Sequence, residues 1–278
     1  MQFATQIWQT FLSIIKIVLQ SRWKTTLPDS FKNKEELLIL ANGPSLNSTI
    51  ENSETFVTTK TLLVVNFFAV SPIFDKIRPE LYLIADPFFW IVPEKYVLLF
   101  KTLADKVTWS MSFFIPVRAC KNKEWQPMIS GNPHIHVYTY NTTPIEGFQH
   151  FCNFVFRKGW GVPRPHNVLI PSIAIALRLP FRKIYLAGAD HSWLSEITVT
   201  NNNVVLMNQK HFYDQGKSQF ATVLQENLKS APLYIILYHM YIAFKSYFVL
   251  ESYSRRLEKE IINITPMSYI DAFKKVNI

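Results

Sequence analysis

Three histidines in this sequence lie in or near segments that are predicted to be loops: His166, His191 and His211. Histidine is the natural general base for removing a proton from a hydroxyl group near neutral pH. The tract from Lys210 to Asp214 is the most suggestive, because it combines an imidazole, the phenol of Tyr213 and a cation. The sequence therefore predicts base chemistry on a hydroxyl, although any single histidine is more often a surface or core residue.

A short apolar run, Leu37–Ala41, leads directly into the turn Asn42-Gly43-Pro44. The run reads as a buried strand, and Ser45 stands where it could cap a following helix. Such a junction often binds phosphate, because free backbone N–H groups and the helix dipole point there. The alternative is an ordinary strand-to-helix turn, since the spacing is neither that of GxGxxG nor that of a P-loop.

The sequence contains no Asp-x-Asp pair. Nucleotide-sugar transferases that need Mg²⁺ or Mn²⁺ often hold the ion with such a pair after a strand, so an enzyme of that kind is disfavoured. A metal held by scattered carboxylates stays open. We expect no metal and no other cofactor.

The elements that must position these groups begin at Glu36, where short apolar runs start to alternate with helical stretches. This alternation predicts an α/β fold with a Rossmann-like, mainly parallel sheet flanked by helices. Asn42, Asn66 and Asp86 follow three of the strands, and carboxyl ends of parallel strands form the ligand crevice. The expected strands are Leu37–Ala41, Thr61–Asn66, Leu81–Ala85, His134–Tyr138, Lys183–Ala187 and Glu260–Ile264.

A helix is expected from Asn167 to Leu179, with Asn167 as its N-cap and its N-terminus near the same sheet edge. The strand Lys183–Ala187 then ends in Gly188-Ala189-Asp190-His191, a second junction that carries ionisable groups. The stretch from Lys217 to Lys259 should be mostly helical, and its apolar middle is either interfacial or buried.

The composition sets limits on partners and compartment. The 278 residues are 49% hydrophobic and 15% aromatic, which favours either a large aromatic core or a surface that meets a membrane. The net charge of +9 is spread along the chain, so nucleic acid is a poor candidate and an anionic small substrate or membrane fits better. The 2 cysteines have no metal or redox spacing and weakly favour a reducing compartment.

The first residues, 1–24, are predicted to form an amphipathic helix that associates with a membrane. Basic residues lie within or after the apolar run rather than before it, unlike a signal peptide, and Lys16 would sit at mid-bilayer in a spanning helix. We expect this helix to lie on the membrane rather than span it. The alternative is a helix packed on the protein's own core.

Four segments, in order from Leu37 to Phe273, resemble the bacterial sialyltransferases of the Campylobacter type, glycosyltransferase family 42, and related polysaccharide-locus transferases. They are ANGPSL within Leu38–Leu46, VVNFF ending the second strand, AIALRLPFRKIYLAGAD after Asn167, and INITPMSYIDAF at Ile262–Phe273. The resemblance implies a CMP-sugar donor bound without metal, a single catalytic domain over residues 36–278, and a lid region at about 191–230.

The resemblance also implies roles for particular residues. His211 would be the catalytic base, and Tyr213 would stabilise the leaving phosphate. Nucleotide binding would fall to Asn42, Gly43, Ser45, Asn66, Asn167, Asp190 and Ser268.

Two departures from the family pattern bear on these roles. Arg164 is only an approximate match to an arginine that precedes the helix in the family. His191, followed by Ser192-Trp193, replaces an expected aromatic pair, which leaves the identity of the sugar open and makes His191 a rival base.

Taken with the residues, the resemblance implies an inverting glycosyltransferase that moves sialic acid or another CMP-activated sugar to a saccharide or lipid-linked glycan acceptor. The expected location is the cytoplasmic side of the cytoplasmic membrane, in surface-polysaccharide synthesis, and a homo-oligomer stays open. Two other functions remain: an ATP-dependent pterin pyrophosphokinase-like phosphotransferase, and a non-catalytic scaffold of a glycan assembly complex.

Overall fold

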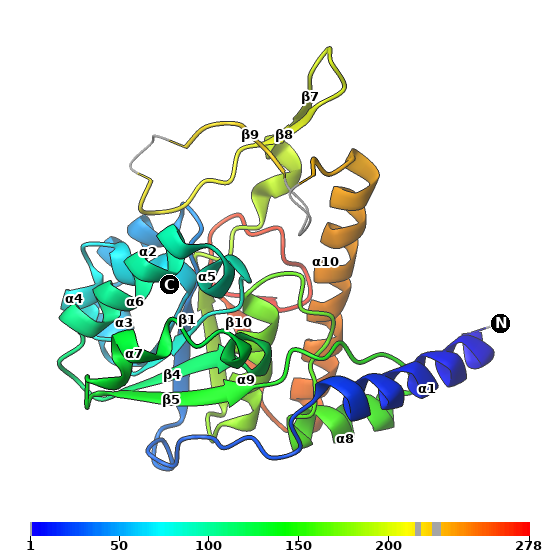
Figure 1. Cartoon of the computed structure of the whole chain (residues 1–278), viewed down its shortest axis with the longest axis horizontal. Coiled ribbons are helices and arrows are strands. Elements are labelled where there is room, and N and C mark those ends of the chain that lie inside the picture. The colour runs from blue at the N-terminus through cyan, green and yellow to red at the C-terminus, as the bar shows by residue number, and fades with distance from the viewer. Residues whose placement is uncertain (1, 215–217, 224–228) are drawn as a thin grey trace.

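The computed structural model describes residues 2–214, 218–223 and 229–278. One parallel sheet of eight strands organises the described chain (Figure 1). The α/β, Rossmann-like fold predicted from the sequence is therefore confirmed. In spatial order the strands are β11 (Lys274–Lys275), β10 (Glu260–Asn263), β6 (Lys183–Ala187), β1 (Glu36–Leu40), β2 (Thr61–Val65), β3 (Leu81–Leu83), β4 (Met111–Pro116) and β5 (Ile135–Tyr140).

The six strands expected from the sequence are present as β1, β2, β3, β5, β6 and β10, with ends displaced by at most two residues. The sequence analysis did not predict β4. All six residues of β4 are buried, and it ends at Pro116. A strand covered on both faces has no alternation of polar and apolar residues to reveal it.

Helices cover both faces of the sheet because its central strands carry apolar, buried side chains on both faces. Leu37 and Ile39 of β1 enter the core under α8 (Gln149–Lys158), α9 (Leu169–Arg178) and α10 (Leu233–Arg256). Leu38 and Leu40 enter the opposite core. That second core lies under α2 (Leu46–Asn52), α3 (Glu54–Thr58), α4 (Phe74–Ile77), α5 (Phe88–Ile91), α6 (Pro93–Lys106), α7 (Gln126–Ser130) and the 3₁₀ turns η1 (Asn66–Val70) and η2 (Val117–Lys121).

A small antiparallel sheet stands above the carboxyl ends of the main strands, beside the first turns of α10 (Figure 1). It follows the turn η3 (Ser192–Glu196) and consists of β7 (Ile197–Val199), β8 (Val205–Met207) and β9 (Ala221–Thr222). Val205 and Met207 pack on Ile236 and Met240 of α10 in a separate small core. We call η3 and these three strands the cap; the lid region expected at about 191–230 falls here and partly outside the described residues.

Two helices differ from their predicted limits. The stretch from Lys217 is not helical where it is described, and α10 begins only at Leu233, directly after Pro232. Proline has no backbone N–H and is tolerated at a helix start, whereas the residue before it is disfavoured in a helix. α9 begins at Leu169, two residues after the expected cap.

By length and composition, α10 is the one helix among the described residues that is long and apolar enough to cross a membrane. Of its apolar window, 39% is buried against the rest of the protein. Core helices of soluble proteins pass the same test.

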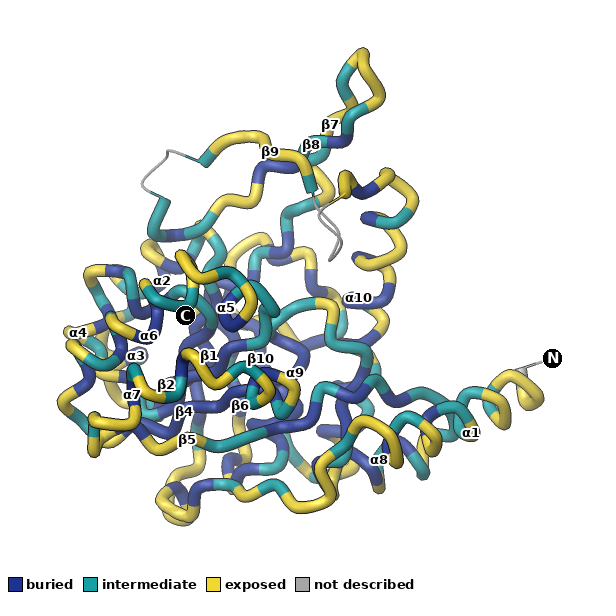
Figure 2. Tube along the Cα trace, viewed as in Figure 1, coloured by how far each residue is buried: buried dark blue, intermediate teal, exposed yellow. Residues whose placement is uncertain are grey.

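α1 (Gln2–Gln20) lies where the sequence predicts an amphipathic helix. It extends from the body of the protein beside α8, and its first turns project beyond the rest of the chain (Figure 1). Much of its length is exposed (Figure 2).

Candidate functional site

The order of the strands defines where a ligand would bind. From β1 the chain builds the sheet outward to β5, then returns to place β6 on the other side of β1. The switch point therefore lies between β1 and β6, and ligands of open α/β sheets bind outside the carboxyl ends of the strands at such a point.

A cavity of about 590 Å³ opens at this place, which is a usual size for a small-molecule site. It is lined by the exits of the strands, by the start of α9, by α10 and by the cap. Seven of the predicted site residues line it: Asn42, Gly43, Asn66, Asn167, Asp190, His191 and His211. Ser45, Tyr213 and Ser268 are not among its lining residues.

The turn after β1 is closed by hydrogen bonds within the protein. Gly43 N donates to Gly188 O at 2.8 Å, and Ser45 N donates to Asp190 Oδ1 at 3.2 Å. The expectation of free N–H groups for a phosphate is therefore wrong at both residues. Ser45 also does not cap α2, because its hydroxyl donates to Asp190 Oδ2 at 2.9 Å.

Asp190 thus ties the end of β6 to the turn after β1. Burial raises the pKa of its carboxyl above the usual value, and the two hydrogen bonds from Ser45 act in the opposite direction. Close packing here also explains Gly43, because a Cβ on that residue would stand 1.9 Å from Asp190 Oδ2 and 2.4 Å from Gly188 O. Glycine is required at this position by its neighbours.

Two asparagines present side chains at the exits of β1 and β2. Asn42 donates through Nδ2 to Val65 O at 3.2 Å, and its Oδ1 is buried without a hydrogen-bond partner. A buried acceptor without a partner is costly, so a donor group of a bound molecule would stabilise it. Asn66 has a left-handed backbone, φ 50°, and its Oδ1 accepts a hydrogen bond from Ala85 N at 3.2 Å. Its side chain thereby links the exits of β2 and β3.

Asn167 organises the start of α9. Its Oδ1 accepts hydrogen bonds from Leu169 N at 3.0 Å and from Ile170 N at 3.2 Å, which confirms the capping role predicted for it. The hydroxyl of Tyr247 donates to the same oxygen at 3.1 Å and lies 2.5 Å from His191 Nε2. Since that hydroxyl has one proton, a consistent network has His191 donating from Nε2 to Tyr247.

His191 is buried and has a left-handed backbone, φ 52°. Burial lowers the pKa of its imidazole to about 3, so the ring is neutral at neutral pH and is a weak base. Its ring packs on Trp193 with 4.1 Å between centroids. These contacts suit a residue that supports the wall of the cavity.

The loop that carries His211 is fastened to the exit of β1, far earlier in the chain. Phe212 N donates to Asn42 O at 3.1 Å, and Asn47 Nδ2 donates to Phe212 O at 2.8 Å. The Phe212 ring is buried against Phe68 with 5.0 Å between centroids. His211 is thereby held at the rim of the cavity that Asn42 lines.

The imidazole of His211 is held in place by Asp214. Its Nδ1 lies 3.3 Å from Asp214 Oδ2, and the same carboxylate oxygen accepts a hydrogen bond from His211 N at 2.7 Å. A carboxylate in this position fixes the tautomer of the ring and stabilises the imidazolium that forms when the ring takes a proton. Tyr213 stacks on His211 with 5.1 Å between centroids, and burial raises the pKa of its phenol, which therefore stays protonated.

The hydroxyl of Ser268 is bonded within the protein, whereas the resemblance implied that it contacts the nucleotide. Its buried hydroxyl donates to Ala189 O at 2.6 Å and accepts from Asn263 Nδ2 at 2.9 Å and from Ile270 N at 3.2 Å. These bonds hold the segment after β10 against the end of β6.

Arg118 lines the cavity just after the end of β4 and was not predicted from the sequence. The guanidinium lies over the Trp90 ring at 5.5 Å from its centroid. Lys210, the other lysine or arginine of the described lining, is paired with Glu196 at 2.5 Å, whereas no ion pair to Arg118 is present among the described residues. Recognising Met111–Pro116 as a strand would have placed Arg118 at a carboxyl end.

His166, the third candidate histidine, also lines the cavity, and its pairing with His239 was not predicted. Their rings stack with 4.7 Å between centroids, and burial lowers the pKa of His166 to about 4. The stacked pair adds a flat surface to the cavity.

The fold is a Rossmann-like α/β fold with a cavity at its switch point, which is the candidate ligand site. No protein-family model and no curated protein matches the sequence. Among solved structures, the chain is similar to one titled the MAf glycosyltransferase from Magnetospirillum magneticum AMB-1, with 12% identity and a TM-score of 0.48. The likeness covers 97% of this chain and 38% of that chain, so this chain spans well under half of that protein's length.

Proposed function

We propose that the protein is a metal-independent, inverting glycosyltransferase that uses a nucleotide-sugar donor. The observation that carries the proposal is the cavity at the switch point, which brings Asn42, Asn66 and Asn167 together with the His211–Asp214 pair at its rim. CMP-activated sugars, with CMP-sialic acid first, are the donors to test, and the acceptor is a saccharide or a lipid-linked glycan. The motif resemblance supports the choice of CMP.

Donor binding would use side chains more than the turn after β1. The unpartnered Oδ1 of Asn42 offers an acceptor to a hydroxyl or amino group of the nucleotide. The N-terminus of α9 faces the cavity through Val168 and Leu169, and its dipole favours a phosphate nearby. Asp190 then has a structural part in the site, because its carboxylate is engaged by Ser45.

Arg118 would bind a negative group farther along the sheet. β4 is three strands from β1, which places it about 14 Å away at the usual spacing between strands. A carboxylate on the donor sugar or on the acceptor fits this position, because a guanidinium binds a carboxylate with two parallel hydrogen bonds.

The transfer itself would need a base and a leaving group. An acceptor hydroxyl attacks the anomeric carbon, a new C–O bond forms, and the bond from that carbon to the nucleotide phosphate breaks with its electron pair leaving on the phosphate. His211 takes the hydroxyl proton, and Asp214 stabilises the resulting imidazolium. Tyr213 does not line the cavity, so its protonated phenol would support His211 through ring stacking rather than contact the leaving phosphate.

His191 is the weaker candidate for the base. Its imidazole is buried, its pKa is lowered to about 3, and its Nε2 is engaged by Tyr247. A general base works best when its pKa lies near the working pH.

The test is a thermal-shift titration with CMP, CDP, UDP, GDP and ATP, each with and without EDTA, followed by turnover assays with CMP-sialic acid. A ligand that binds only the folded state raises its melting temperature by mass action. Stabilisation by CMP that survives EDTA is the expected result. Stabilisation by ATP alone that EDTA abolishes would favour the phosphotransferase, and no stabilisation by any nucleotide would favour the scaffold.

A further inference from the structure

α1 is attached to the protein through polar contacts on one side of the helix. Ser13 Oγ donates to Glu146 O at 2.8 Å and accepts from Glu146 N at 2.9 Å, and Phe148 N donates to Thr10 Oγ1 at 3.0 Å. Just beyond the helix, Ser21 Oγ donates to Trp160 O at 2.5 Å. A helix on a water-soluble surface normally turns its apolar side inward, whereas α1 buries Ser13 beside Ile17 and leaves most of its apolar side chains exposed.

The backbone of the segment under α1 is shaped for this contact. Gly147 has a φ of 129°, and a Cβ on it would stand 2.1 Å from Thr10 Oγ1. Only glycine combines that backbone with so close an approach. The orientation of α1 is therefore fixed by the body of the protein.

The outward side of α1 is apolar and largely exposed, and of its rings Phe3 also packs edge-on against Phe148 of the protein body with 5.5 Å between centroids. Eight large apolar side chains on the helix have exposed fractions between 39% and 76%, whereas Ile17 is 4% exposed. So large a contiguous apolar surface on a soluble protein marks an interaction site. The eight, which we call the outer face, are Phe3, Ile7, Trp8, Phe11, Ile14, Ile15, Val18 and Leu19.

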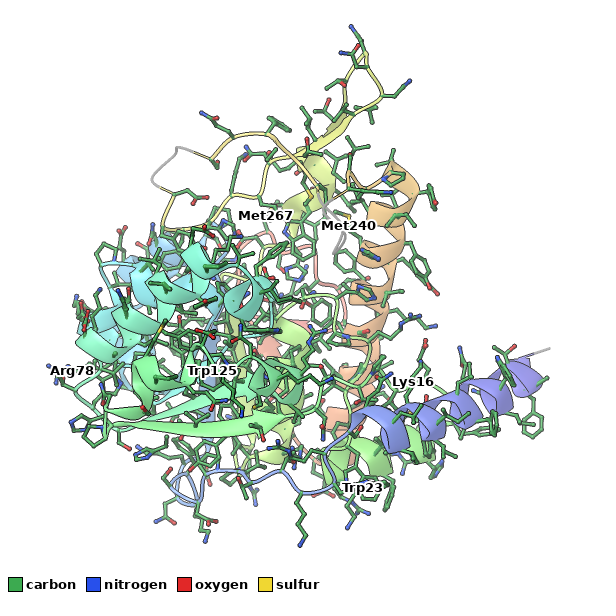
Figure 3. All side chains as sticks on the ribbon, viewed as in Figure 1. Lys16, Trp23, Arg78, Trp125, Met240 and Met267 are labelled. Carbon is green, nitrogen blue, oxygen red and sulfur yellow. The ribbon has the colours of Figure 1, made fainter. Side chains whose placement is uncertain are left out.

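Aromatic and basic side chains continue from this face at the base of the helix. Trp23, 54% exposed, packs edge-on against Trp160 with 4.8 Å between centroids, and Phe154 also packs edge-on against Trp160 at 5.6 Å. Arg157 and Lys158 lie over the Phe154 ring at 6.0 and 5.9 Å. Figure 3 shows Trp23 at the end of α1, near the body of the protein, and Lys16 farther along the helix.

The charged side chains of residues 1–28 are all basic. Lys16, Arg22 and Lys24 lie in or beside α1, and no aspartate or glutamate precedes Asp29 in the sequence. Tryptophan and basic side chains around an apolar helix face are characteristic of a helix that lies in the interface of an anionic membrane.

We propose that the outer face of α1, with Trp23, Trp160 and Phe154 at its base, docks the protein on an anionic lipid surface. The helix lies in the interface, because its polar contacts hold the opposite side on the protein body. A second copy of this chain is a poorer occupant, since residues 1–28 offer no carboxylate to pair with these basic groups. This proposal stands independently of the proposed transferase activity.

The test is co-sedimentation of the full chain with phosphatidylcholine vesicles, with and without about 30 mol% phosphatidylglycerol. The variant is Phe11→Asp with Leu19→Asp. The matched control is Ile91→Asp with Leu98→Asp, two exposed apolar residues on α5 and α6. All four positions are at least half exposed, so circular dichroism melts of the three proteins should agree.

The wild type and the control should bind the anionic vesicles, and the variant should bind at least about tenfold more weakly. Binding should also weaken in about 0.5 M NaCl, because salt screens the basic groups. Equal binding by the variant, or no binding by the wild type, would overturn the proposal. A wild-type dimer in solution that the variant converts to monomer would assign the outer face to a second copy instead.

Discussion

Replacing Gly43 by alanine should damage both the stability of the protein and the nucleotide site. The new Cβ would meet Asp190 Oδ2 at 1.9 Å and Gly188 O at 2.4 Å, so the carboxylate and the end of β6 must both move. Overpacking a tight site costs about 1–3 kcal/mol, and losing the hydrogen bond from Ser45 to a buried carboxylate costs about 1.5–3 kcal/mol. Together we expect a loss of about 3–5 kcal/mol in the free energy of unfolding.

Urea unfolding and thermal melts would measure this loss. At roughly 2–4 °C per kcal/mol, the melting temperature should fall by about 6–20 °C, and stabilisation by CMP should disappear. Gly131→Ala is the matched control, because Gly131 has an ordinary helical backbone and a Cβ there would meet nothing within 4 Å. That variant should keep or slightly raise the melting temperature. Gly43→Ala with the stability and nucleotide binding of the wild type would refute the account of the turn.

Three further outcomes are expected. His211→Ala should lower kcat with CMP-sialic acid by about 10²–10⁴ while retaining CMP binding. Asp214→Asn should lower kcat less. Wild-type turnover in His211→Ala would remove this residue from the mechanism. Arg118→Gln should weaken binding of CMP-sialic acid relative to CMP by about tenfold or more, as measured by calorimetry. The control is Arg78→Gln, because Arg78 lies over the Trp109 ring, away from the cavity. This control should leave both affinities unchanged. If only acceptor affinity falls in Arg118→Gln, the carboxylate belongs to the acceptor. His191 has a pKa of about 3 when folded against 6.5 ordinarily, so the unfolded chain binds its proton first and stability falls as the pH drops below about 6.5. The wild type should lose up to about 1.4 kcal/mol per pH unit more than His191→Gln between pH 6 and pH 4 in urea titrations, and parallel profiles would contradict a buried neutral ring.

The sequence predicted the sheet well because apolar runs bounded by turn residues are a local signal. It located the exits of β1 and β2, and Asn167 as the cap of α9, from the same short-range rules. The sequence could not predict that the backbone N–H of Ser45 would donate a hydrogen bond to Asp190, since the two residues are 145 apart in the chain.

The position of His211 and the role of Arg118 also could not be predicted from the sequence. The anchoring of the His211 loop depends on Phe212 reaching Asn42, which no periodicity in the sequence reports. Arg118 was missed because β4 is buried on both faces and shows no alternation. The orientation of α1 was also beyond the sequence, which shows that a helix has two faces but not which one meets the protein.

The separate core of the cap has a consequence for how specificity could change over time. Val205 and Met207 rest on the first half of α10, whereas Tyr247 and Leu250, further along the same helix, belong to the core under the main sheet. Substitutions at Met207 of β8 or at Trp193 and Glu196 of η3, which line the cavity, can therefore remodel its roof while the floor that holds Asn42 and Asn167 keeps its packing. In a transferase, such a division would let one donor-binding framework serve a succession of acceptors, with new linkages arising from changes in a few residues of the cap.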